Sequence, residues 1–279
     1  MGEHLGPAAG LTFAAAAAAG YGVASVLQAT GARRATGLLQ TLRAPAYLVG
    51  IVLDLLAWLA SLVALRTLPV YQVQAVLAGS LAVTVVVARF RLSARLRPVD
   101  VAAVVVTVAA LVVLAASAGP QDPARPPGAV RLGLALAAIP VALAGWVGAR
   151  WGRPALNAAL AGLAFGGAAL CARAAVLPAD PLHGLPAVAS EPPVWALAVY
   201  GLTGTLLYAH ALEHGAVGPV TAVLWIVEVV VPSVIGVLLL GDTVRPGWSV
   251  TAAVAVAATV AAAVVLANAP ATAATSPKA

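Results

Sequence analysis

Two carboxylates lie in the middle of long apolar runs and are the side chains best suited to chemistry in this 279-residue chain. Asp54 falls near the middle of residues 45–65, and Glu228 falls near the middle of residues 215–240. An ionised acid near the centre of a bilayer costs about 2.5 to 3.5 kcal/mol on insertion scales, so it needs a compensating role. Binding a cation or carrying a proton would supply that role. We therefore expect both acids to lie in one substrate or ion site.

A proline follows Glu228 by about one helical turn. Pro232 lacks the backbone amide that would bond the carbonyl of Glu228, so the sequence predicts a kink and a free carbonyl beside the carboxylate. This notch at the membrane midplane could coordinate a cation or accept a proton. We expect Pro232 to act as a hinge.

Further polar and aromatic residues recur at helical spacing on the runs that hold the two acids and on two other runs. Packing is the alternative for each of them, because such residues commonly form hydrogen bonds between membrane helices. The site predicted from this spacing comprises Asp54, Glu228, Trp58, Tyr71, Gln74, Tyr200, Thr203, His210, Thr221 and Trp225.

Three other residues inside apolar runs have structural interpretations. Arg173 is expected either to extend to the membrane interface or to pair with a buried carboxylate. Gly162 and Gly166 have three residues between them, which predicts a close contact between helices rather than a ligand site.

No enzymatic chemistry is predicted. His210, Glu213 and His214 resemble a metal cluster, but the sequence shows no fourth ligand, so the presence of a metal is left open. There is no phosphate-binding loop of the GxxxxGK[ST] type. Residues 239–242, Leu-Leu-Gly-Asp, also lack the Gly-x-Gly-Asp pattern of intramembrane aspartyl hydrolases. We expect neither an enzyme nor a cofactor.

The composition predicts an all-α polytopic membrane protein. Hydrophobic residues make up 62% of the chain and charged residues 9%, which is more apolar surface than a soluble core can bury. The net charge of +6 does not indicate nucleic acid, because the basic residues lie in short gaps between apolar runs. Nine transmembrane helices are predicted, at about 9–29, 45–65, 68–88, 99–118, 130–149, 155–177, 193–212, 215–240 and 247–268.

The distribution of basic residues predicts the orientation. The gaps after spans 1, 3, 5 and 7 and the C-terminus hold ten Lys and Arg, whereas the N-terminus and the other gaps hold five when Arg131 and Arg173, near the edges of their spans, are included. Because cytoplasmic loops carry the excess of positive charge, we expect the N-terminus outside and the C-terminus in the cytoplasm, in the inner (cytoplasmic) membrane. Residues 269–279 are predicted to form a disordered cytoplasmic tail.

Three landmarks recur at nearly one offset. Pro45 and Pro193 are 148 residues apart, Pro69-Val70 and Pro219-Val220 are 150 apart, and Arg97-Pro98 and Arg245-Pro246 are 148 apart. They predict one repeat at about 9–118 and a second at about 155–268, joined by a linking helix at 130–149. Since each repeat has four spans, the single extra crossing inverts the second repeat. The predicted arrangement is an inverted 4+1+4 repeat.

Several motifs resemble the drug/metabolite transporter superfamily (EamA-like). Residues 229–248, VVVPSVIGVLLLGDTVRPGW, resemble its pattern of a small-residue helix ending in Leu-Gly-Glu, a basic turn and a final helix, with Asp242 in place of the glutamate. Residues 25–34 and 208–225 are similar to segments of the nine-helix magnesium transporters of NIPA type, with Ala209-His210 where that branch has Asn-Lys. The resemblance implies a transporter built from inverted repeats.

We therefore expect a secondary transporter that moves a small cation or metabolite by alternating access, with proton coupling left open. A Mg2+ transporter of NIPA type is one alternative, and a non-catalytic membrane scaffold is an alternative of another class. The expected partners are the lipid bilayer and a small-molecule or ion substrate, not nucleic acid, and a homodimer is left open.

Overall fold

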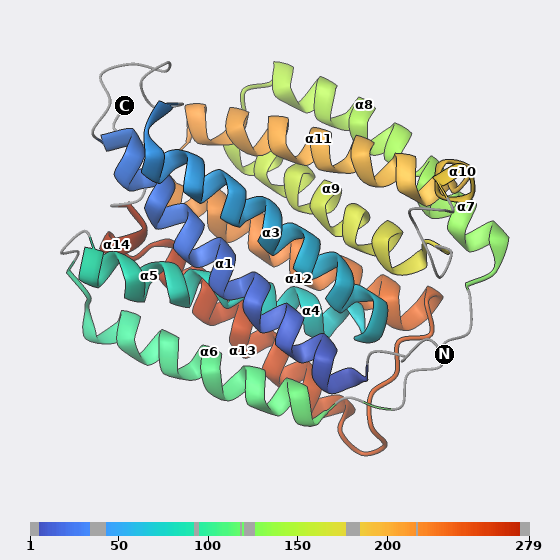
Figure 1. Cartoon of the computed structure of the whole chain (residues 1–279), viewed down its shortest axis with the longest axis horizontal. Coiled ribbons are helices and arrows are strands. Elements are labelled where there is room, and N and C mark those ends of the chain that lie inside the picture. The colour runs from blue at the N-terminus through green and yellow to red at the C-terminus, as the bar shows by residue number, and fades with distance from the viewer. Residues whose placement is uncertain are drawn as a thin grey trace.

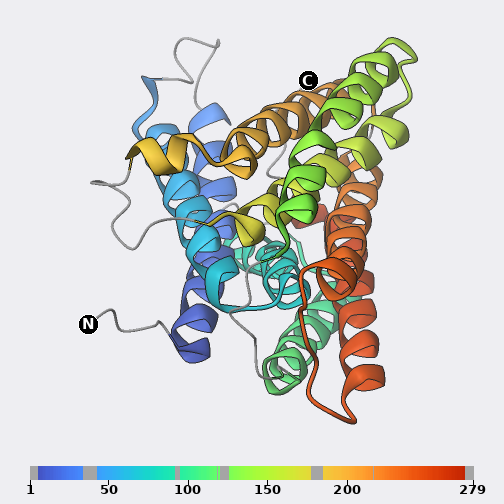
Figure 2. The same cartoon turned by 90° about the vertical axis from the view of Figure 1, so that its right-hand side faces the viewer.

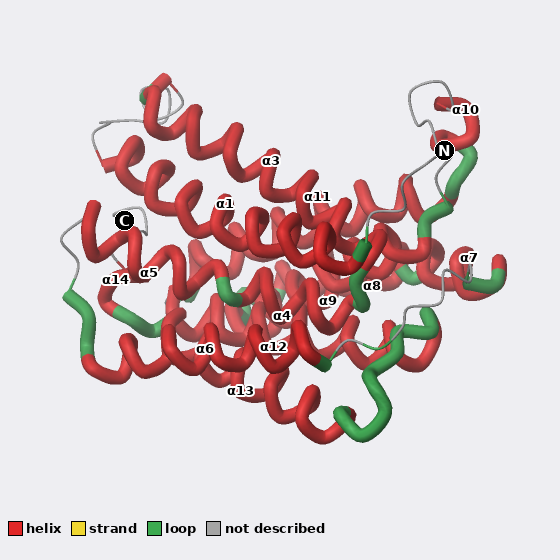
Figure 3. Tube along the Cα trace, turned by 60° about the horizontal axis from the view of Figure 1, so that its bottom comes forward, coloured by secondary structure: helices red, strands yellow, loops and turns green. Residues whose placement is uncertain are grey.

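A computed structural model describes residues 6–33, 43–91, 95–117, 119, 126–176, 185–215 and 217–273, and in this part of the chain the regular structure is helical (Figure 3). Nine helical stretches within it are long and apolar enough to cross a membrane, which confirms the nine predicted spans. Two of the stretches consist of a pair of consecutive helices. The helices are α1 (Pro7–Arg33), α3 (Pro45–Thr67), α4 (Val70–Ala78), α5 (Ser80–Arg91), α6 (Pro98–Ala116), α7 (Gly128–Leu136), α8 (Ala138–Arg150), α9 (Pro154–Ala174), α10 (Leu185–Ala189), α11 (Pro192–His214), α12 (Val217–Leu239), α13 (Ser249–Ala267) and α14 (Pro270–Ala273).

Prolines mark where several spans begin. Pro45, Pro98, Pro154 and Pro192 occupy the first turns of α3, α6, α9 and α11. A proline is tolerated there because the first amides of a helix have no partner within the helix, and the fixed φ of the ring suits helix entry. The repeated sequence landmarks thus fall at or near helix starts.

Consecutive spans run in opposite directions, and the loops gather at two ends of the bundle (Figures 1 and 3). One end, called the Arg97 end, holds the starts of α3, α6, α9 and α12 (Figure 1). The opposite end, called the Asp242 end, holds the ends of α3, α9 and α12 and the start of α1 (Figure 1). Large apolar side chains are exposed along α3, α6, α11 and α12, as expected for helices that face lipid.

The helices α4 and α5 form the central span of the bundle (Figure 2). Every residue of α4 is buried. Gly79 separates the two helices and is buried, and a Cβ there would lie 3.1 Å from Cδ1 of Leu111 on α6. The break therefore lies in protein surroundings, where membrane helices tolerate irregular backbone.

The helix contacts follow one scheme in both halves of the chain. The helix α1 packs on α3 and α5, and α9 packs on α11 and α12. Between the halves, α4 packs on α12 and α6 packs on α13. The helices α7 and α8 pack on α9 and α11.

Part of the predicted disordered tail is helical. Residues 270–273 form α14, so the prediction of disorder from residue 269 is wrong for this segment. Ala269 is buried, and the Thr272 hydroxyl donates a 2.5 Å hydrogen bond to the carbonyl of Leu266, which fastens the turn to the end of α13. The remainder of the predicted tail, 274–279, lies outside the described residues.

Candidate functional site

The segment of α12 that holds Glu228 is packed tightly against α9. A Cβ on Gly162 would lie 2.5 Å from the carbonyl oxygen of Leu224 and 3.1 Å from the amide nitrogen of Glu228. A Cβ on Gly166 would lie 3.0 Å from the ring of Pro232. The predicted close contact at these two glycines is confirmed, and it holds the acid and the proline in place.

The backbone carbonyl of Glu228 has a partner. The side-chain amide of Gln74, fully buried on α4, donates a 3.2 Å hydrogen bond to it. The prediction of a free carbonyl is therefore wrong, because a side chain from α4 supplies the donor that the proline removes. The helix α12 continues through Pro232, and the hinge role of this residue stays a prediction.

Tyr21 connects the two predicted acids. It lies on α1, half-buried, with its hydroxyl beside Ser61 and within electrostatic range of the carboxylates of both Asp54 and Glu228. Both acids are half-buried, Asp54 on α3 and Glu228 on α12. The hydroxyl of a tyrosine can donate to one carboxylate and exchange a proton with it. The Tyr21 hydroxyl on α1 thus interacts electrostatically with one acid on α3 and one on α12.

Two glycines let Tyr21 reach this position. A Cβ on Gly20 would lie 2.9 Å from Cβ of Ala57 on α3, and a Cβ on Gly22 would lie 2.6 Å from Cβ of Val83 on α5. The helix α1 can therefore approach both neighbours closely. Tyr21 was missed in the sequence, where the only signal is a tyrosine between two glycines after a run of alanines.

A second tyrosine approaches Glu228 from α11. Tyr208 lies within electrostatic range of the Glu228 carboxylate. Its hydroxyl makes a 2.8 Å hydrogen bond with the hydroxyl of Thr221, a buried predicted site residue on α12. Trp225, one turn along α12, is half-buried and packs against three of the apolar clusters. The helices around Glu228 thus carry the hydroxyl groups of Tyr208 and Thr221 and the aromatic ring of Trp225.

The other predicted site residues lie in different surroundings. Trp58 is 37% exposed on α3, and Thr203 is half-buried on α11. Tyr71 is buried in a cluster with α6 and α13 residues. Tyr200 packs on Gly167 and donates a 3.2 Å hydrogen bond to the carbonyl of Leu134. His210 lies in the last turn of α11, at the Arg97 end.

At the Asp242 end, the side chain of Asp242 contacts two other helices. The Asp242 carboxylate accepts a 2.6 Å hydrogen bond from the amide of Val70, the first residue of α4, and lies 3.4 Å from the guanidinium of Arg173. An anion at a helix N-terminus is stabilised by the free amides and the helix dipole. Burial raises the pKa of Asp242, and the Val70 amide and Arg173 offset only part of this rise. Of the two alternatives for Arg173, the structure shows pairing with a carboxylate.

Two glycines place the Asp242 carboxylate. Gly241 has a φ of 71°, a left-handed conformation that suits glycine and ends α12. A Cβ on Gly236 would lie 2.6 Å from Oδ2 of Asp242, so only glycine leaves room for the carboxylate there. At the same end, Nη1 of Arg66 donates a 2.6 Å hydrogen bond to the carbonyl of Ala175, which joins α3 to the end of α9. Four spans therefore meet in one polar cluster.

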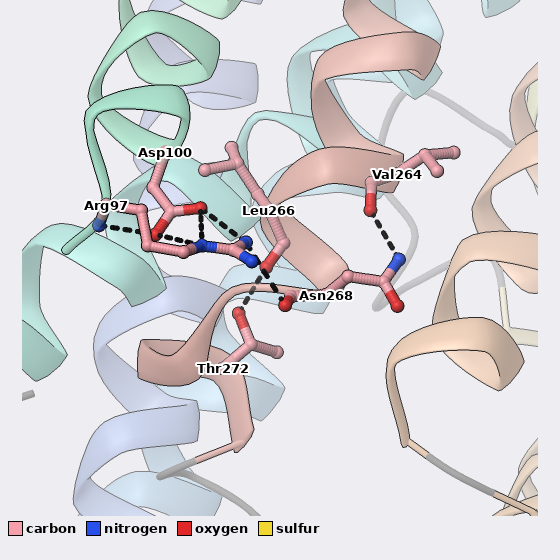
Figure 4. Close-up of polar contacts among 6 residues, drawn as sticks. All are labelled: Arg97, Asp100, Val264, Leu266, Asn268 and Thr272. Atoms are coloured by element: carbon pink, nitrogen blue, oxygen red, sulfur yellow. Dashed lines mark hydrogen bonds and ion pairs between the residues drawn. The ribbon is translucent and has the colours of Figure 1, made fainter. Parts of the chain in front are cut away.

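Another ion pair lies at the Arg97 end (Figure 4). The side chain of Arg97 bonds the carboxylate of Asp100 at 2.8 Å, and its Nη2 donates at 3.3 Å to the carbonyl of Asn268. These contacts join the start of α6 to the end of α13. They connect two spans, fewer than the cluster around Asp242.

Two grooves on the described surface do not include Asp54 or Glu228. One lies between α7, α8 and α11, and another lies between α6 and α13. Apolar side chains dominate both, and neither contains Asp54 or Glu228. They therefore match lipid-facing depressions better than a site for a charged ligand.

Comparisons of the chain with protein-family models, with curated proteins and with solved structures find no match.

Proposed function

We propose that this chain is a secondary transporter of the drug/metabolite transporter type, which moves a small cation or a metabolite through a site at Asp54, Glu228 and Tyr21. The observation that carries the proposal is that the Tyr21 hydroxyl lies within electrostatic range of both acids. Ionisable groups inside a membrane are expensive, and in transporters they mark substrate and ion pathways. A tyrosine hydroxyl within electrostatic range of two carboxylates can help to hold a cation or pass a proton.

The alternating-access mechanism rests on an inverted 4+1+4 repeat. Its support is the shared contact scheme, in which α1 with α3 and α5 corresponds to α9 with α11 and α12. Corresponding helices run in opposite directions, as an inverted repeat requires (Figure 1). In this arrangement Asp54 and Glu228 come from opposite repeats. One site then faces each side of the membrane in turn.

The polar cluster at the Asp242 end acts as the gate of this cycle. The basic residues of the loops favour an inner-membrane orientation with the N-terminus outside, which puts Asp242 on the outer side. Contacts among Val70, Arg173 and Asp242 join α4, α9 and α12 at that side. Outward opening then requires the Arg173–Asp242 pair to separate. Arg97 and Asp100 form the inner pair.

A monovalent or organic cation suits the site better than bare Mg2+. Among the described residues, the carboxylates that interact with Tyr21 are those of Asp54 and Glu228, and Mg2+ gives up its water reluctantly without several oxygen ligands. Aromatic and hydroxyl groups such as Trp225 and Tyr208 add contacts that suit an organic cation. Mg2+ stays a member of the test panel.

A thermal-shift screen followed by flux measurements tests the proposal. Purified protein is heated with metal ions, organic cations and metabolites at pH 5.5 and 7.5, because a ligand of the folded state must stabilise it. Stabilising compounds are then assayed for uptake into proteoliposomes. Glu191→Gln is the matched control for the loss of an acid at Glu228, since Glu191 pairs with Arg131 away from the site. Flux in the wild type and in this control is expected. A folded protein without flux for any compound would favour a scaffold.

A further inference from the structure

A cluster of three side chains in the last turn of α11 takes no part in the proposed transport site. The ligand atoms of His210, Glu213 and His214 all lie within 4.8 Å of one another. Their spacing of i, i+3 and i+4 puts them on one face of the helix. His210 is half-buried, and the other two are exposed, so an ion from solution can reach the cluster.

The hydrogen bonds of the two histidines fix which nitrogens are free. Nε2 of His210 lies 3.1 Å from the carbonyl oxygen of Ala149 on α8, and Nδ1 of His214 lies 2.9 Å from the carbonyl oxygen of His210. A carbonyl only accepts, so these nitrogens carry the protons. In the neutral rings, Nδ1 of His210 and Nε2 of His214 then hold free lone pairs. Metal-ligating histidines commonly bond a backbone carbonyl through the other nitrogen in this way.

One pair of these free atoms has nearly the spacing of two ligands around a small divalent ion. Nδ1 of His210 lies 3.7 Å from Oε2 of Glu213. In a tetrahedral Zn2+ site with bonds of about 2.0 to 2.1 Å, two ligand atoms are separated by about 3.4 Å. Glu213 is 69% exposed on its side chain, so a small rotation closes this difference.

We propose that His210, Glu213 and His214 form a binding site for a divalent transition metal such as Zn2+, with water as the fourth ligand. Two imidazoles and one carboxylate select such ions over Mg2+, which prefers oxygen ligands. Three protein ligands with one open position are a common zinc arrangement. Because Ala149 holds His210, a bound ion strengthens the link between α11 and α8 at the Arg97 end.

Calorimetric titration of the detergent-purified chain, freed of any affinity tag, tests this site. ZnCl2 at pH 7.5 is expected to bind with one equivalent and to raise the melting temperature, whereas MgCl2 does neither.

The Zn2+ affinities of variants test whether these three side chains bind the ion. His214→Ala and Glu213→Gln are each expected to lower the Zn2+ affinity about tenfold or more, by analogy with the effect of weakened metal shells. Glu191→Gln is the matched control for Glu213→Gln, because Glu191 pairs with Arg131 away from the cluster, and it keeps full affinity. Absence of Zn2+ binding, or equal losses in the control, would overturn the proposal and leave an ordinary His210–Glu213 ion pair. Because His214 is exposed, its replacement leaves the fold intact.

Discussion

The side-chain amide of Gln74 donates a 3.2 Å hydrogen bond to the backbone carbonyl of Glu228. Pro232 leaves this carbonyl without its usual helical partner, and a buried unpaired carbonyl would cost about 1 to 3 kcal/mol. A polar residue of α4 thus completes the backbone of α12. The contact joins the predicted first repeat to the second at the proposed site.

Replacing Gln74 by leucine is expected to lower the unfolding free energy by about 1 to 3 kcal/mol, because it leaves the Glu228 carbonyl buried without a donor. Pro232→Ala restores an amide four residues after Glu228 and should rescue the Gln74→Leu variant. The double variant should therefore lose less stability than the sum of the single variants. Melting in detergent measures this, and strictly additive losses would show that the hydrogen bond does not matter.

Pro232→Ala by itself is expected to slow transport without removing binding, because a continuous hydrogen-bond ladder stiffens α12. Flux into proteoliposomes gives the turnover, and a thermal shift with the same compound gives the binding. Unchanged turnover would show that the proline is not a hinge.

Gly162→Ala is expected to lower stability by about 1 to 3 kcal/mol, because the new Cβ would lie 2.5 Å from the carbonyl of Leu224. Gly201→Ala on α11 is the matched control, since nothing lies within 4 Å of a Cβ there. Melting temperatures of the two variants compare the positions directly. Equal effects would contradict the tight packing of α9 on α12.

The stability of the chain should depend on pH through Asp242. Because burial raises the pKa of Asp242, the folded chain binds its proton more readily than the unfolded chain. The contribution of Asp242 to the unfolding free energy is therefore greatest below the ordinary aspartate pKa of about 3.9 and falls as the pH rises through the raised pKa. Melting temperatures between pH 3.5 and 8 should show this fall in the wild type and lack it in Asp242→Asn, and identical profiles would rule it out.

Tyr21→Phe is expected to reduce flux while the protein stays folded, because it removes only the hydroxyl that interacts electrostatically with Asp54 and Glu228. Tyr47→Phe is the control. Tyr47 lies on α3 and its Cβ packs against Gly31 of α1, so its hydroxyl is not part of this contact. Proteoliposome flux with normalised protein content makes the comparison. A fully active Tyr21→Phe variant would remove the tyrosine from the mechanism.

The nine spans were predictable because a run of about 20 apolar residues has few other solutions. The close contact at Gly162 was also predictable, because two small residues with three residues between them commonly mark helix interfaces. Both signals are local in the sequence. They do not depend on which helices become neighbours.

The contacts of the candidate site were not predictable in the same way. Tyr21 gains its importance only because α1 lies against α3 and within reach of α12, some 200 residues along the chain. The partner of Gln74 is a backbone carbonyl, which leaves no residue pattern. Whether Arg173 extends to the lipid interface or forms an ion pair depends on the position of Asp242, which Gly236 and Gly241 set. Each of these outcomes is set by tertiary packing.

Asp54 and Glu228 are proposed to serve one site, and flux measurements on the two single variants and on the double variant test this directly. Asp54→Asn and Glu228→Gln are each compared with the wild type and with the double variant in proteoliposomes, using a compound from the thermal-shift screen. If the two acids serve one site, each single change lowers flux about tenfold or more and the double variant loses no more than the worse single variant, since residues that act as a unit are not additive. Full activity of Glu228→Gln, or losses that multiply in the double variant, would contradict a shared site.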